Sequence, residues 1–122
     1  MILAFKWQFK EKILDGSKIH TIRRDNKNRW NRGNIIYFTN ETCSDINNYF
    51  KIGECINTQK IEIMQNVGLT IKVDDKYISK DQINSLFKND GFDDLIDFLI
   101  FFNKNYGQHF TGKIIHWTDF KY

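Results

Sequence analysis

The sequence contains no proline and only two cysteines in 122 residues. The absence of proline, together with many isoleucine, lysine and asparagine residues, is typical of an A+T-rich genome and carries little information about mechanism. Cys43 and Cys55 have no companions at the spacing of zinc ligands, so we expect no metal site and no cofactor. With no export signal in the sequence, we predict that both cysteines are reduced thiols.

Long apolar runs are also absent. The first five residues are apolar, but the run ends at Lys6 and is too short for the apolar core of a secretory signal. No other run approaches the roughly 18 residues of a membrane-spanning helix. We therefore expect a cytoplasmic protein with no membrane partner.

What the sequence does contain is typical of one folded domain over residues 1–122. Hydrophobic residues make up 41% and charged residues 27%, which argues against disorder. The 11 phenylalanines suggest a core or groove built from aromatic rings. The net charge of +3 is mild, but its distribution is uneven. The densest basic cluster comprises Lys18, Arg23, Arg24, Lys27, Arg29 and Arg32.

The segment around this cluster has a predictable local structure. Apolar residues at helical spacing predict a short helix over residues 7–14, and Gly16 follows where a helix would end in a left-handed residue. The β-branched run 20–23 predicts a strand with Thr21 and Arg23 on one face and His20 and Ile22 on the other. The alternative is a solvated strand whose charges simply face water.

The rest of the chain reads as short strands and two further helices. We expect strands at residues 2–6, 34–39, 54–64, 69–73, 76–78 and 111–117, with a register break near Gln59. Residues 40–53 are polar and irregular, and we leave them unassigned. Ser79 and Gln82 have the spacing of a capping box that opens the second helix. This pattern predicts an α+β fold whose strands curl into a small mixed barrel.

The third predicted helix begins after Asp93 and Asp94 and ends at Gly107. It is apolar nearly all round, which leaves two interpretations. Either it packs deeply into the protein, which we prefer, or part of it covers a partner subunit in a homodimer.

Four short motifs, in this order, point to a known family. They are Gly16-x-Lys18-x-x-Thr21-x-Arg23, Arg29-Trp30-x-x-Gly33 before an apolar strand, Asn89-Asp90-Gly91-Phe92 before an apolar helix, and the closing strand 112–117. With these motifs the chain resembles the ASCH domain family. The resemblance implies a PUA-like fold, a small mixed β-barrel with about three helices packed around it.

One branch of that family implies catalysis. Small ASCH proteins include amidohydrolases that remove the acetyl group from N4-acetylcytidine, and the resemblance maps their lysine, threonine and carboxylate onto Lys18, Thr21 and Asp90. That branch has glutamate where this chain has Asp90, which is one carbon shorter. A threonine hydroxyl needs a base, and a lysine serves only if its pKa is lowered. The alternatives are phosphate positioning by Lys18 and Thr21, and a simple turn role for Asp90.

The other implied role is non-catalytic binding of RNA or a modified nucleoside. Arg23, Arg24, Arg29 and Arg32 would contact phosphate. Trp30 would stack on a base, or would instead be a buried anchor. His116 would face the cleft; we expect no metal role for it or for His20. A ribonuclease of the ASCH type would be a third variant that uses the same groove.

Overall fold

The computed structural model describes residues 1–43 and 45–122. In this part of the chain, eight strands and three α-helices form an α+β fold, as predicted. The strands are β1 (Ile2–Phe5), β2 (His20–Arg23), β3 (Ile35–Asn40), β4 (Tyr49–Glu54), β5 (Asn57–Met64), β6 (Thr70–Val73), β7 (Lys76–Tyr77) and β8 (His109–His116). The helices are α1 (Lys10–Asp15), α2 (Lys80–Asn89) and α3 (Leu95–Tyr106), with 3-10 turns η1 (Trp7–Phe9) and η2 (Glu41–Cys43).

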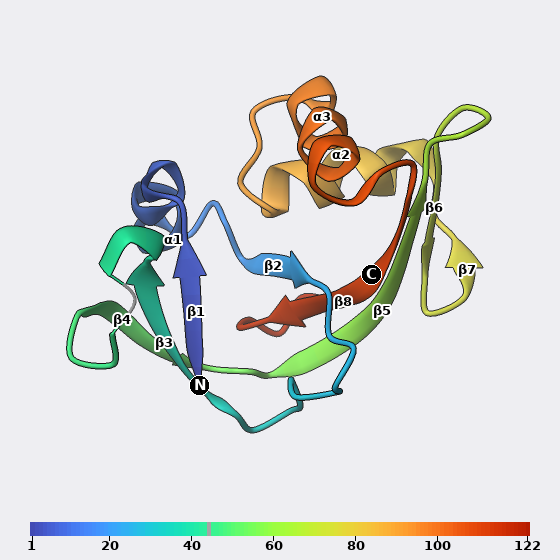
Figure 1. The fold of residues 1–122 in the computed structure, drawn as a ribbon. Helices are drawn as coiled ribbons and strands as arrows, with labels where there is room; N and C mark the ends of the chain where they lie inside the picture. The colour runs from blue at the N-terminus through green and yellow to red at the C-terminus, as the bar shows by residue number, and fades with distance from the viewer. Residues whose placement is uncertain (44) are drawn as a thin grey trace.

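The strands form two open sheets (Figure 1). The smaller sheet has the order β1-β3-β4, with β1 parallel to β3 and β4 antiparallel to it. The larger sheet has the order β2-β8-β5-β6-β7 and is antiparallel throughout. The chain passes from one sheet to the other three times, between β1 and β2, between β2 and β3, and between β4 and β5.

The predicted closed barrel is not present among the described strands. β1 is the edge of one sheet and β2 is the edge of the other, so no strand ladder joins them. A side chain spans the gap instead: Arg23 Nη2 donates to the carbonyl oxygen of Ala4 at 2.9 Å. The edge carbonyl of β1 is thus satisfied by a guanidinium rather than by a neighbouring strand.

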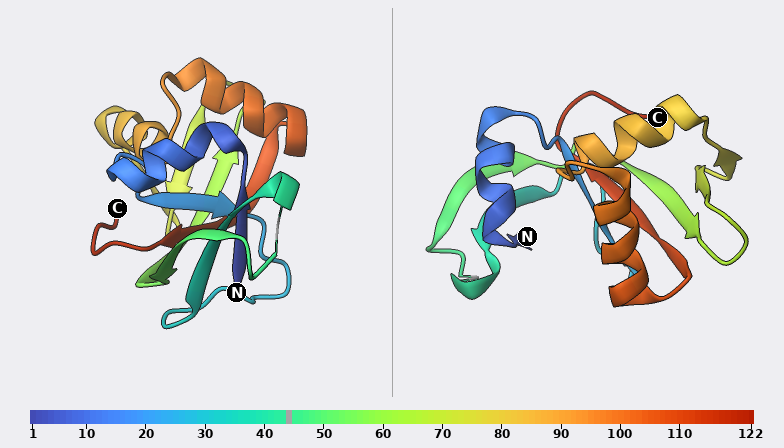
Figure 2. Two further views of the ribbon diagram at one scale, coloured as in Figure 1. Left: turned by 90° about the vertical axis from the view of Figure 1, so that its left-hand side faces the viewer. Right: turned by 90° about the horizontal axis from the view of Figure 1, so that it is seen from above.

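Two apolar cores lie under the helices. In Figure 2, α1 lies against the three-stranded sheet, and α2 and α3 lie against the five-stranded sheet. β8 contributes to both cores, because Ile114 packs in the cluster beneath α2 and α3 while Ile115 packs with β1 and β3. This strand therefore joins the two halves of the molecule.

The third helix is packed on one face and open on another. Phe98 and Phe102 are buried in the core, which confirms the preferred interpretation for that face. Ile96 and Ile100 are 68% and 58% exposed. The predicted partner subunit for this open face stays a prediction. None of the helices in the described residues has the length and apolar character needed to cross a membrane.

The local signals at helix ends are confirmed. Gly16 ends α1 in the left-handed region with φ of 86°. Ser79 and Gln82 form the predicted capping box at the start of α2. The Asp94 side chain accepts from Asp97 N at the start of α3, whose first helical residue is Leu95.

Two predictions between residues 40 and 64 are corrected. The stretch 40–53 was expected to be irregular, but it contains η2 and most of β4, which pairs with β3. β4 leaves Tyr49 and Ile52 exposed, so it lacks the alternation that identifies a half-buried strand. The expected strand 54–64 is divided at residues 55 and 56. Gln59 does not break the register of β5, because it is buried on the same face as Ile61 and Ile63.

Cys55 is a buried free thiol between β4 and β5. Burial raises the pKa of this thiol, so it is protonated near neutral pH. Cys43 was also predicted to be a reduced thiol, but its side chain lies outside the described part of the structure.

Candidate active site

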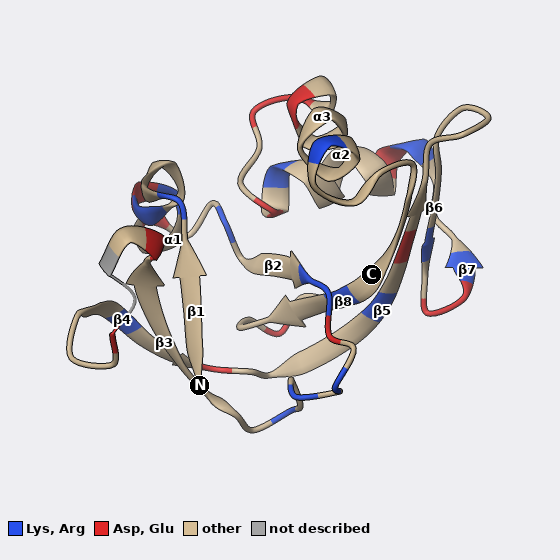
Figure 3. Ribbon diagram, in the orientation of Figure 1, with Lys and Arg blue, Asp and Glu red and all other residues tan. Residues whose placement is uncertain are grey.

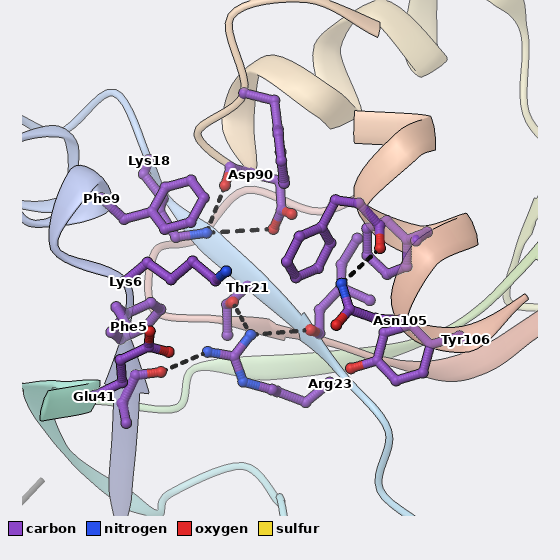
Figure 4. Close-up of a pocket in the computed structure, with 15 residues that line it drawn as sticks. Phe5, Lys6, Phe9, Lys18, Thr21, Arg23, Glu41, Asp90, Asn105 and Tyr106 are labelled. Atoms are coloured by element: carbon purple, nitrogen blue, oxygen red, sulfur yellow. Dashed lines mark hydrogen bonds and ion pairs between the residues drawn. The ribbon is translucent and has the colours of Figure 1, made fainter. Parts of the chain in front are cut away.

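A cavity of about 270 Å³ lies in the gap between β1, β2 and α3. Its aromatic wall consists of Phe5, Phe9, Phe92, Phe101, Phe102 and Tyr106. Its polar lining includes all three predicted catalytic residues, Lys18, Thr21 and Asp90 (Figure 4). The open edge between the sheets is therefore where residues far apart in the sequence meet.

Lys18 is the deepest charged group of the site, with only 2% of its surface exposed. Its Nζ donates to His20 O at 2.8 Å and to Asp90 O at 2.5 Å, and lies 3.4 Å from Asp90 Oδ1. The ammonium also lies 5.0 Å from the centre of the Phe9 ring. All three N–H groups of the ammonium thus have a partner.

The burial of Lys18 changes its chemistry. Burial lowers the pKa of Lys18 to about 8, against the opposing effect of the Asp90 carboxylate and with a smaller lowering by Arg23. About one Lys18 side chain in ten is then a neutral amine at pH 7. An ordinary exposed lysine would be almost entirely charged, so this amine can act as a base near neutral pH.

Backbone contacts between two turns hold Lys18 beside Asp90. Lys18 N donates to Lys12 O at the end of α1, and Ile19 N donates to Asn89 O at the end of α2. Gly91 then turns away in the left-handed region with φ of 97°. A Cβ at Gly91 would lie 2.9 Å from Phe9 Cδ1 and 3.0 Å from Lys18 Cδ, so only glycine lets the turn approach the lysine.

Asp90 combines a position at the end of a helix with a side chain that lines the cavity. It ends α2 as a turn residue, and its side chain is also buried, with the residue 4% exposed. Its Oδ1 lies 3.2 Å from His20 Nδ1 in addition to its contact with Lys18. Burial lowers the pKa of His20, which is 0% exposed, so this imidazole is neutral at pH 7.

Thr21 and Arg23 share one face of β2, as the period-two pattern predicts. Arg23 Nη1 donates to Thr21 Oγ1 at 2.8 Å. A guanidinium has no acceptor, so the threonine oxygen accepts here and its own proton points elsewhere. Lys18 Nζ and Thr21 Oγ1 line the same cavity, but the hydrogen bonds of Nζ go to His20 and Asp90.

The residues predicted to bind nucleic acid are not gathered in one place. Arg23 lines the cavity, and the Arg24 guanidinium lies 5.0 Å from the ring centre of Tyr106 in its wall. Arg29 and Arg32 are exposed on the loop from β2 to β3, which carries cations away from β2 (Figure 3).

Trp30 and His116 lie in the protein interior. Trp30 is 8% exposed and packs in the core beside β1 and β3, as expected if it is a buried anchor. His116 is 0% exposed, and its Nε2 lies 3.0 Å from Gln59 Oε1. Burial and the neighbouring His20 lower the pKa of His116 to about 4. Neither ring is placed to touch a ligand in the cavity.

Sequence reasoning missed several residues of the site. Lys6, Glu41 and Asn105 line the cavity, and Tyr122 contacts His20 behind it. Glu41 falls in the stretch that had no assignment, and Tyr122 belongs to a polar tail with no pattern. Among the described residues, no three His, Cys, Asp or Glu side chains are grouped so that they could hold a metal ion.

Comparisons with protein-family models, with curated proteins and with solved structures give no match for this chain.

Proposed function

We propose that this cavity binds a small modified nucleoside and hydrolyses its exocyclic amide, as in an N4-acylated cytidine. The observation that carries the proposal is the buried Lys18 amine, whose pKa is lowered to about 8 and which lies in one cavity with a threonine hydroxyl and a buried carboxylate. The motif resemblance to ASCH amidohydrolases supports the same assignment. We further propose that the two sheets correspond to a PUA-like fold in which β1 and β2 do not pair.

The reaction begins with the neutral Lys18 amine, which takes the proton of the Thr21 hydroxyl. Thr21 Oγ1 then attacks the carbonyl carbon of the substrate amide, and Arg23 stabilises the negative charge that develops beside it. The carbon–nitrogen bond breaks, and the proton passes from the Lys18–Asp90 pair to the leaving N4 nitrogen. Water then hydrolyses the Thr21 ester, which releases the carboxylic acid and restores the hydroxyl.

The cavity suits a nucleoside better than a nucleic acid strand. Its volume of about 270 Å³ is just below the usual range of ligand pockets, which starts near 300 Å³, so it has room only for a small ligand. Aromatic rings along one wall can stack on a base. Glu41 and Asn105 provide an acceptor and an amide for the polar edge of that base.

The experiment is incubation of the purified protein with N4-acetylcytidine, followed by chromatography for cytidine. Thr21→Val keeps the shape of the side chain and removes the hydroxyl, and we expect it to lower turnover at least a thousandfold. Thr70→Val, on β6 and away from the cavity, is the matched control and should retain turnover. No cytidine from the wild type at high protein concentration, or equal turnover by Thr21→Val, would contradict the proposal.

A second candidate function is binding of RNA or a nucleotide without catalysis, or cleavage of RNA in the same groove. The exposed cations Arg24, Arg29 and Arg32 favour it, since they can contact phosphates outside the cavity. Affinity for RNA would then fall steeply with salt, with a slope set by the number of phosphates contacted. A salt-independent affinity for the nucleoside alone would favour the hydrolase.

A further inference from the structure

A line of buried and partly buried hydrogen bonds runs from Asn89 and Tyr122 to the cavity. Asn89 Nδ2 donates to the Tyr122 hydroxyl at 3.1 Å, and this hydroxyl lies 2.7 Å from His20 Nε2. The other ring nitrogen of His20 contacts Asp90 Oδ1, which in turn lies 3.4 Å from Lys18 Nζ. Only the last two residues, Asp90 and Lys18, line the cavity.

The direction of the bonds in this line follows from the Asp90 carboxylate. A carboxylate only accepts, so His20 Nδ1 carries the proton of the neutral ring and donates it to Asp90 Oδ1. His20 Nε2 is then an acceptor, so the Tyr122 hydroxyl donates to it, while the Tyr122 oxygen accepts from Asn89 Nδ2. Asp90 therefore receives a hydrogen bond from His20 on one side and from Lys18 on the other.

Tyr122 is held in this position by Gln59. Tyr122 N donates to Gln59 Oε1 and Gln59 Nε2 donates to Tyr122 O, both at 2.8 Å. Gln59 Nε2 also donates to Asp74 Oδ2 at 3.0 Å, which fixes the orientation of the amide. Gln59 is only 3% exposed and shares a strand face with Ile61 and Ile63, and these contacts with Tyr122 satisfy its buried amide.

We propose that Tyr122 and His20 are positioning residues that act in series to hold the Asp90 carboxylate against Lys18. Neither touches the substrate. The Tyr122 hydroxyl stabilises this His20 tautomer by donating to Nε2, and His20 in that tautomer keeps Asp90 from rotating away from the amine. The role in catalysis rests on the proposed amide hydrolysis, whereas the tautomer of His20 does not depend on it.

The direct test is nitrogen-15 NMR of the two His20 ring nitrogens. In the wild type we expect the proton on Nδ1 and none on Nε2. Tyr122→Phe removes only the hydroxyl that donates to Nε2, so the tautomer with its proton on Nε2 should become populated and the proton should exchange between the two nitrogens. Tyr77→Phe is the matched control, since that ring is 68% exposed on β7 and its loss of a hydroxyl should leave His20 unchanged.

Asn89→Asp is a second variant that leaves the tyrosine ring in place. An aspartate at this position accepts the Tyr122 proton, which takes the donor away from His20 Nε2 without creating a cavity. We expect the same exchange between the two ring nitrogens as in Tyr122→Phe. If Tyr122→Phe does not fold, Asn89→Asp decides the question alone.

The kinetic readout is hydrolysis of N4-acetylcytidine by the same variants. Because Tyr122 lies outside the cavity, kcat should fall about tenfold with KM unchanged. A proton on Nε2 of wild-type His20, or an unchanged tautomer in both variants, would overturn the proposal. If kcat is unchanged in variants whose His20 proton no longer stays on Nδ1, Tyr122 and His20 have no role in catalysis. If the wild type does not hydrolyse this substrate, the proposed function is refuted. The NMR comparison would still show whether Tyr122 stabilises the His20 tautomer.

Discussion

At the residue scale, the site is a lysine and an aspartate that are both removed from water. Burying such a pair costs free energy that is recovered only if the remaining hydrogen bonds are well placed. Here Lys18 Nζ has two backbone carbonyls besides Asp90, and Asp90 Oδ1 has His20 besides Lys18. The pair is thus stabilised as a unit, and removing one member leaves the other as an uncompensated buried charge.

Lys18→Met should destabilise the protein by about 3 kcal/mol, because it leaves the Asp90 carboxylate buried beside a neutral histidine. The double variant Lys18→Met/Asp90→Asn removes both charges and should be more stable than the single variant. Urea denaturation at pH 7 measures both free energies of unfolding. A double variant that is less stable than Lys18→Met would show that the two residues do not act as a pair.

At the scale of elements, the site depends on the turn that follows α2. Gly91 has a positive φ, and its Cα faces Phe9 and Lys18 so closely that a methyl group would not fit. Gly33 provides a matched comparison, since its φ of 94° is similar but nothing lies within 4 Å of an added Cβ. The same substitution at the two positions therefore separates the cost of backbone strain from the cost of contact with Phe9 and Lys18.

Gly33→Ala should lower the free energy of unfolding by about 1–2 kcal/mol, which is the cost of a left-handed alanine. Gly91→Ala adds an overpacking penalty of about 1–3 kcal/mol to the same strain, and it displaces Lys18 as well. We expect hydrolysis of N4-acetylcytidine to be lost in Gly91→Ala and retained in Gly33→Ala. Thermal and urea denaturation with parallel activity assays would test this. Equal losses of stability and activity in the two variants would contradict a close contact between position 91 and Lys18.

Elements defined by local chemistry were predictable, and those defined by distant pairing were not. The left-handed end of α1 at Gly16 and the capping box at Ser79 each follow from residues a turn apart. β4 was missed because its exposed Tyr49 and Ile52 gain strand structure only from β3. Gln59 was misread because its partner, Tyr122, is 63 residues away.

The same contrast applies to the site. Lys18, Thr21 and Arg23 were found because they lie close together on one short motif, and Asp90 because it belongs to a recognisable turn. Trp30 and His116 have the same side-chain chemistry as a stacking ring and a proton carrier, but burial excludes both from the cavity. Burial is a property of the whole fold, so composition could not decide these two cases.

At the scale of the whole molecule, the cavity exists because the two sheets do not close. A ladder between β1 and β2 would fill the gap in which Lys18, Thr21 and the aromatic wall now meet. Arg23 joins the two edges by donating to Ala4 O and to Thr21 Oγ1. The open edge is thus compensated by a cation that also lies where negative charge would develop in the proposed reaction.

The measurement that tests this mechanism most directly is the rate of N4-acetylcytidine hydrolysis as a function of pH. The base must be neutral to accept the Thr21 proton, so kcat/KM should rise with pH through a midpoint near the Lys18 pKa of about 8 and then level off. The rise should disappear in Lys18→Met, whose turnover is lost. A rate that is flat or falls across this pH range, or no hydrolysis at any pH, would contradict the assignment of Lys18 as the base.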